Sequence, residues 1–103
     1  MTFPLHIIVQ ATAEASRLSP SELTGPSRRR ELAWARQIGM VIAKQYTSRT
    51  WREIATAFGR EDHATASHGV RSMQDRLEAH DDLALQRLAI IDRAHALTEK
   101  AIA

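Results

Sequence analysis

Two helix starts lie on either side of one glycine in the segment Thr50–Val70, whose sequence is TWREIATAFGREDHATASHGV. Thr50 and Glu53 have the spacing of a capping box, in which each side chain bonds a free backbone N–H of the first turn. Asp62 is a favoured N-cap residue for a second helix, and Gly59 suits the left-handed turn between the two helices. The segment therefore predicts a helix-turn-helix unit.

The second helix of this unit has an apolar and a polar face. At about 100° of rotation per residue, one side carries the apolar side chains that we expect to face the core, Ala66, Val70, Met73 and Leu77. The opposite side carries small or hydrogen-bonding side chains, Ala64, Ser67, His68 and Arg71, flanked by His63 and Thr65. Such a face can touch base edges in the major groove of DNA, and the helix N-terminus offers N–H groups to a phosphate.

Catalytic and metal-binding roles for the same residues are less favoured. Asp62, His63 and Thr65 are nearly consecutive and do not align easily as a hydrolase triad, and the chain has no nucleophile elbow. His63 and His68 are five residues apart, which does not place them on one helix face as metal ligands. We therefore predict no enzymatic activity, no metal and no cofactor. A purely structural helical hairpin stays open, because helix-turn-helix patterns are permissive.

Size and composition indicate one modest globular domain. The chain has 103 residues, of which 44% are hydrophobic, and this is enough for a single core. It contains no cysteine, which excludes disulfides, thiolate catalysis and cysteine-based zinc sites. The first residues, MTFPLHIIVQA, lack a basic leader and are too short an apolar run to span a bilayer. We expect a cytoplasmic protein with no membrane or small-molecule partner.

The net charge is +2, but the charges are unevenly distributed, with a basic block in the middle of the chain. Residues 25–52 carry one acidic side chain, Glu31, against seven basic ones, a net charge of +6. The basic side chains are Arg28, Arg29, Arg30, Arg36, Lys44, Arg49 and Arg52. Residues 53–103 carry a net charge of −3. A block of this kind indicates a polyanionic partner, although composition alone supports a solvated helix face equally well.

In the rest of the chain, the spacing of apolar residues predicts helices, and the alternation typical of strands is absent. A first helix is expected over about Pro4–Arg17, and a short second one starts at a Ser19–Glu22 capping box and ends before Gly25-Pro26. Ser27 is the expected cap of a longer helix with a buried stripe of Leu32, Ala35, Gly39, Ile42 and Tyr46. After a helix over about His63–Glu78, a last amphipathic helix is expected over about Leu83–Lys100, with apolar positions at Leu83, Leu88, Ile91, Ala94 and Leu97.

This pattern predicts an all-α fold. We expect a compact multi-helix domain with a helix-turn-helix in residues 1–80. An added C-terminal amphipathic helix in residues 81–103 should pack on this domain.

Two motifs in this order resemble a known family. Residues 35–59, ARQIGMVIAKQYTSRTWREIATAFG, are similar to an Arg-Gln-(aliphatic)-(small)-Met helix followed by a helix that ends in Phe-Gly. Residues 62–69, DHATASHG, are similar to an Asp-His-Thr-Thr-Val-x-His-Ala signature. Over Leu5–Leu77 the chain thus resembles the C-terminal DNA-binding domain (domain IV) of the bacterial replication initiator DnaA.

The resemblance implies which residues touch DNA. Its minor-groove arm falls on Arg28, and its base-reading positions fall on Asp62, His63, Thr65 and His68. Together with the residue patterns above, the predicted interface comprises Arg28, Arg29, Arg30, Arg36, Lys44, Trp51, Arg52, Asp62, His63, Ala64, Thr65, Ser67, His68 and Arg71.

The chain also departs from the family pattern. The family usually has Gly-Gly-Arg-Asp-His-(Thr or Ser)-Thr-Val, where this chain has Arg60 for the second Gly, Glu61 for Arg, Ala64 for the first Thr and Ala66 for Val. Trp34-Ala35 replaces an Arg-Pro. Glu61 puts an anion where a cation would face phosphate, and we expect Arg60 to replace part of that charge. The methyl of Ala64 can still meet a thymine methyl.

We predict sequence-specific binding of double-stranded DNA at DnaA-box-like sites, in the initiation or regulation of bacterial chromosome replication. The expected location is cytoplasmic and nucleoid-associated. The alternative is an interaction module that regulates the full-length replication initiator by protein contacts, with weak or no base-specific DNA binding. Glu61 and Ala64 favour this alternative. The 103 residues contain no Walker A motif, so if they are the whole protein we expect a free-standing domain without its own ATPase.

Overall fold

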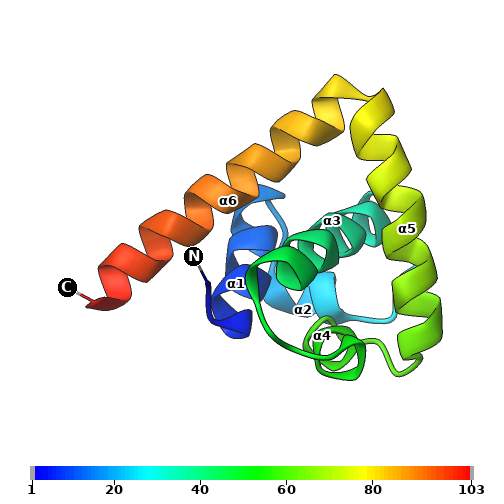
Figure 1. Ribbon diagram of the computed structural model, residues 1–103, viewed down its shortest axis with the longest axis horizontal. Helices are drawn as coiled ribbons and strands as arrows, with labels where there is room; N and C mark the ends of the chain where they lie inside the picture. Colours follow the sequence, from blue (N-terminus) through cyan, green and yellow to red (C-terminus); the bar gives the residue numbers. More distant parts are fainter. Residues whose placement is uncertain (1, 103) are drawn as a thin grey trace.

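Six α-helices make up the chain in the computed structural model, which describes residues 2–102 without the side chain of Ile102. They are α1 (Leu5–Ala15), α2 (Pro20–Thr24), α3 (Arg30–Tyr46), α4 (Trp51–Ala57), α5 (His63–Ala79) and α6 (Asp81–Ile102). Within the described residues there is no strand, which confirms the predicted all-α fold. Figure 1 shows α5 and α6 meeting at a corner, with the other four helices between them.

Side-chain hydrogen bonds cap α2, α4 and α5 at the residues that the sequence indicated, whereas α3 starts differently. Ser19 with Glu22, and Thr50 with Glu53, form complete capping boxes. At α3 the prediction is wrong: the N-cap is Arg29, which makes no side-chain cap bond. The hydroxyl of Ser27 instead accepts a 3.3 Å bond from the N–H of Arg29. Helical backbone begins only at Arg30, so Ser27 lies too far upstream to reach the free N–H groups of the helix.

The core is built around α3. Leu32, Ala35, Gly39 and Ile42 are buried as predicted, whereas Tyr46 is only partly buried. At Gly39, α1 and α4 come so close that an added Cβ would lie 2.7 Å from the Phe58 ring and 2.7 Å from the hydroxyl oxygen of Thr12. This close packing joins the helix-turn-helix to the N-terminal half of the chain.

The last helix packs on α1 and shares this core. Leu83, Ala94 and Leu97 are buried as predicted, and Ile91 is partly buried. The prediction for Leu88 is wrong, because its side chain is 56% exposed and Ile90 takes the buried position. The corner between α5 and α6 is the single residue His80. The division of the chain into residues 1–80 and 81–103 stays a prediction.

The turn between α4 and α5 depends on Gly59. Its φ of +76° is the left-handed conformation that the sequence indicated. The turn also lies against the end of α2, since a Cβ at Gly59 would be 2.0 Å from the carbonyl oxygen of Thr24. Backbone packing of this kind fixes the position of α5 relative to residues 25–29. No helix in the described part of the chain has the length and apolar character needed to cross a membrane.

Candidate nucleic-acid interface

The outward face of α5 has the orientation that its sequence predicted. Ala66, Val70 and Met73 are buried against the core, and Leu77 is partly buried. On the other side, His63, Ala64, Thr65, His68 and Arg71 are exposed. Ser67 is partly buried and donates a 3.1 Å hydrogen bond from its hydroxyl to the carbonyl of Ala64. The exposed side chains present acceptors, donors and a methyl group along the first two turns, which is the chemistry of base reading.

Asp62 organises the start of this helix. Its carboxylate accepts bonds from the N–H of Ala64 at 2.9 Å and of Thr65 at 3.2 Å. The hydroxyl of Thr65 donates a further 2.8 Å bond to it. The bond from the Thr65 side chain, followed by those from the backbone, lowers the pKa of Asp62 below its usual value. Asp62 is therefore an ionised N-cap. Its carboxylate already binds two of the backbone N–H groups that we expected to be free for a phosphate.

Three arginines precede or begin α3. Arg28, Arg29 and Arg30 are all exposed. Arg29 forms a 2.6 Å ion pair with Glu31, which is worth little to stability because both side chains are in solvent. Arg28 lines a hollow of about 700 Å³ that is also lined by Thr65 and Gly69 of α5. The structure thus brings Arg28 and the start of α5 to one cavity.

Arg36 is mostly buried. Only 3% of its surface is exposed. Its guanidinium donates to the backbone carbonyl of Leu23, to that of Gly25 at 3.0 Å and to that of Glu22 at 3.5 Å. Burial, and then the nearby charge of Arg60, lower the pKa of Arg36. These bonds satisfy carbonyls at the end of α2, so Arg36 joins α2 to α3. Arg36 also lines the 700 Å³ hollow, and a contact with DNA stays a prediction.

Arg60 is partly buried and lines the same 700 Å³ hollow, so a role as a cation near a phosphate stays a prediction. Its guanidinium donates to the carbonyl of Gly25, the same oxygen that accepts from Arg36. The chain therefore ties the base of the Arg28 segment to the helix-turn-helix at the position where the family has a glycine. Glu61, the next residue, is exposed at the edge of the 700 Å³ hollow.

A second group of predicted residues lies at the start of α4. The ammonium of Lys44 lies 5.0 Å from the centre of the Trp51 ring, a cation–π distance. Trp51 is partly buried and Arg52 is exposed. Arg49 is engaged by Glu53 in a 3.1 Å ion pair. Lys44, at the end of α3, and Arg52, in the first helix of the helix-turn-helix, are thus exposed cations near each other in sequence.

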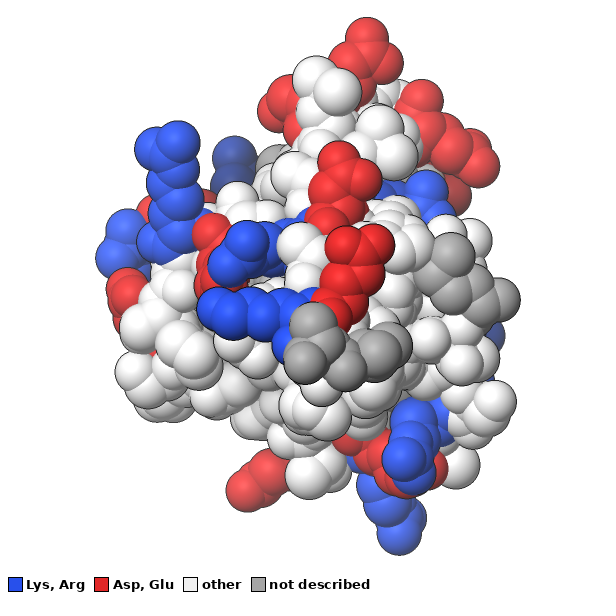
Figure 2. All heavy atoms as spheres, turned by 90° about the vertical axis from the view of Figure 1, so that its left-hand side faces the viewer, with Lys and Arg blue, Asp and Glu red and all other residues white. Residues whose placement is uncertain are grey.

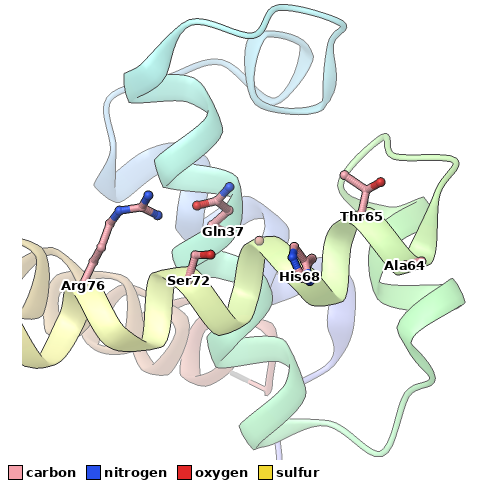
Figure 3. Close-up of a pocket in the computed structure, with 7 residues that line it drawn as sticks. Gln37, Ala64, Thr65, His68, Ser72 and Arg76 are labelled. Carbon is pink, nitrogen blue, oxygen red and sulfur yellow. The ribbon is translucent and has the colours of Figure 1, made fainter.

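Sequence reasoning missed four residues of this surface. A hollow of about 530 Å³ between α3 and α5 is lined by Gln37, Gly69, Ser72 and Arg76, together with Ala64, Thr65 and His68. Figure 3 shows the Gln37, Ser72 and Arg76 side chains directed into the space between the two helices. A signal was present, because residues 65, 69, 72 and 76 are spaced by four, three and four, as one helical stripe requires.

The face that carries the ends of α1 and α6 has a different character. Figure 2 shows basic and acidic side chains intermixed there, with acidic side chains gathered at the end where α5 meets α6 in Figure 1. Four exposed carboxylates belong to that corner, Asp75, Glu78, Asp81 and Asp82. These carboxylates disfavour a polyanion at the tip of the corner, which leaves the surface formed by residues 28–30 and the rest of α5 as the better candidate interface.

Comparison with known proteins agrees with this architecture. The family model described as "Bacterial dnaA protein helix-turn-helix" matches residues 5–73. The chromosomal replication initiator protein DnaA of Microcystis aeruginosa is 37% identical over 95 residues, which cover 90% of this chain and 21% of that protein. The corresponding protein of Cereibacter sphaeroides is 39% identical over 77 residues, or 75% of this chain and 17% of that protein.

The DnaA protein of Thermomicrobium roseum is 33% identical over 90 residues, which cover 87% of this chain and 19% of that protein. The chain therefore spans about a fifth of the length of these relatives. The family match extends from the start of α1 to Met73 in α5, and so it includes the Gly59 turn and the exposed turns of the second helix. The chain belongs to the bacterial DnaA helix-turn-helix family.

Proposed function

We propose that the chain binds double-stranded DNA and acts in the initiation or regulation of bacterial chromosome replication. The observation that carries this proposal is the exposed polar face of α5 beside Arg28, across one hollow, in a member of the DnaA helix-turn-helix family. In this arrangement α5 enters the major groove and Arg28 reaches the adjacent minor groove. Lys44 and Arg52 contact phosphates on the other side of α5.

The chemistry of the first turn of α5 indicates how bases are read. The ionised carboxylate of Asp62 accepts hydrogen bonds only, so among base edges it suits the amino groups of cytosine or adenine. His63 and His68 are exposed imidazoles, each with one donor and one acceptor when neutral. Ala64 offers a methyl to a thymine. This set of groups differs from that of the family signature at residue 64, so we propose DnaA-box-like sites with an altered preference at one position.

A binding titration tests the function directly. The protein is titrated against a DnaA-box duplex and a scrambled duplex at two salt concentrations. Specific binding is expected to exceed binding to the scrambled duplex, and both are expected to weaken as salt rises. If no duplex is bound even at low salt, while the full-length initiator is captured, the proposal is wrong and the protein acts through protein contacts.

His63→Ala is expected to reduce discrimination between duplexes. His63 is exposed and no side-chain hydrogen bond holds it within the fold, so its removal leaves the capping network of Asp62 in place. Affinity for the preferred duplex should fall by about 1–3 kcal/mol, with little change on random DNA. Fluorescence anisotropy with both duplexes measures this. Equal losses on the two duplexes would remove His63 from base reading.

Glu61→Arg is expected to tighten DNA binding. Glu61 lies exposed at the edge of the hollow beside Arg28, where its charge repels a phosphate backbone. The substitution should raise affinity for any duplex about threefold to tenfold at low salt, and less at high salt, where charges are screened. Titrations at both salt concentrations measure the difference. An unchanged affinity at low salt would place Glu61 outside the DNA footprint.

A further inference from the structure

A cluster of one tryptophan and two arginines lies where α3 and α5 face each other. The guanidinium carbon of Arg30, on α3, is 5.2 Å from the centre of the Trp34 ring. The guanidinium carbon of Arg76, on α5, is also 5.2 Å from it. Contacts of this length are attractive cation–π interactions, and they leave guanidinium N–H donors free for another acceptor. Trp34 therefore brings cations from two helices to one ring.

In the described part of the chain, neither arginine forms an ion pair, although Asp75 and Glu78 of the acidic corner are neighbours of Arg76 along α5. Within the described residues, the ion pairs are those between Arg29 and Glu31, Arg49 and Glu53, and Arg93 and Glu14. Two guanidinium groups at one ring repel each other, and a bound anion would offset this repulsion. A phosphate is a suitable anion, because its several oxygens accept hydrogen bonds from planar guanidinium groups.

Arg76 connects the cluster to the hollow between α3 and α5. Arg76 lines that hollow together with Thr65, Gly69 and Ser72, and Figure 3 shows Arg76 at the opposite end of it from Thr65. From Thr65 to Arg76 the stripe extends about 16 Å along the helix, at 1.5 Å per residue. A stripe of this length allows one nucleic-acid strand to contact more than one residue of the stripe.

We propose that Arg30 and Arg76, held at Trp34, form a binding site for a phosphate of the duplex backbone. The proposal rests on the proposed function. A helix in the major groove lies beside the strand that separates this groove from the minor groove. With Arg28 in the minor groove, that strand passes between residues 28–30 and α5, along the stripe that begins at Thr65. The site extends the footprint beyond the residues of the DnaA signature.

Arg76→Met separates this role from a packing role. Methionine keeps an unbranched apolar chain against Trp34 and removes the charge. Affinity for every duplex is expected to fall about threefold to tenfold at physiological salt, and the slope of log K against log salt should decrease by about 1. Lys100→Met removes the same charge from an exposed position on α6, and it should leave the slope unchanged. Thermal unfolding establishes that both variants are folded.

A second measurement identifies the phosphate. Duplexes carrying one neutral methylphosphonate at a time are titrated with the wild-type protein and with Arg76→Met. At the contacted position, the methylphosphonate should lower the affinity of the wild-type protein but cause no further loss in Arg76→Met. Such a difference is a coupling in the double-mutant cycle. If the variant keeps the wild-type slope, or no position shows coupling, the phosphate site is wrong while the proposed function stands. If the wild-type protein binds no duplex at low salt, both are wrong.

Discussion

Gly59→Ala is expected to lower the free energy of unfolding by about 2–5 kcal/mol. Two costs add at this position. The φ of +76° is a conformation that a residue with a Cβ adopts only under strain. The new methyl would also lie 2.0 Å from the carbonyl oxygen of Thr24 and 2.8 Å from its carbon. Both are backbone atoms, so the turn must move away from α2 and α5 must move with it.

Chemical denaturation measures this loss, and Gly69→Ala is the matched control. The Cβ at Gly69 would meet only the side chain of Gln37, at 3.0 Å, which can rotate away. Its unfolding free energy should stay within about 1 kcal/mol of the wild type, because helix propensity favours alanine over glycine. If Gly59→Ala were as stable as Gly69→Ala, the close packing of the turn on α2 would be contradicted.

Arg28→Glu is expected to weaken binding to every duplex by about tenfold to a hundredfold at physiological salt. The substitution removes a cation from the hollow beside α5 and places an anion there, next to Glu61. Because fewer counterions are released on binding, the slope of log K against log salt should decrease by about 1. The loss should be larger for duplexes with A·T-rich flanks, since their narrow minor grooves attract arginine.

Titrations at three or more salt concentrations measure both quantities. Lys100→Glu makes the same change of charge at the C-terminal end of α6, which lies on the opposite side of the molecule from α5 in Figure 1. This control should change affinity far less, because its charge lies away from the proposed interface and salt screens the interaction between distant charges. Equal effects of the two reversals would remove Arg28 from the interface and would indicate only a response to net charge.

The helix starts at Ser19, Thr50 and Asp62 could be predicted because their hydrogen bonds join residues two or three positions apart. Such contacts form within one turn, and their residue types show in the sequence. The orientation of α5 could be predicted for a similar reason, since a helix of period 3.6 with one apolar face has one way to bury it. The burial of Leu88 was mispredicted, because α6 has more apolar side chains than its contact with α1 can bury.

The availability of each cation was decided by tertiary structure. The sequence by itself determined the six-helix order, the glycine turn and a basic block in the middle of the chain. It could not separate Arg28, which is exposed, from Arg36 and Arg60, whose guanidinium groups bond the carbonyl of Gly25. That oxygen is 11 residues from Arg36 and 35 from Arg60 along the chain. Similarly, Trp34 and Arg76 meet only because α3 and α5 pack together. Contacts between residues so far apart exist only after the helices have packed, so no local pattern in the sequence encodes them.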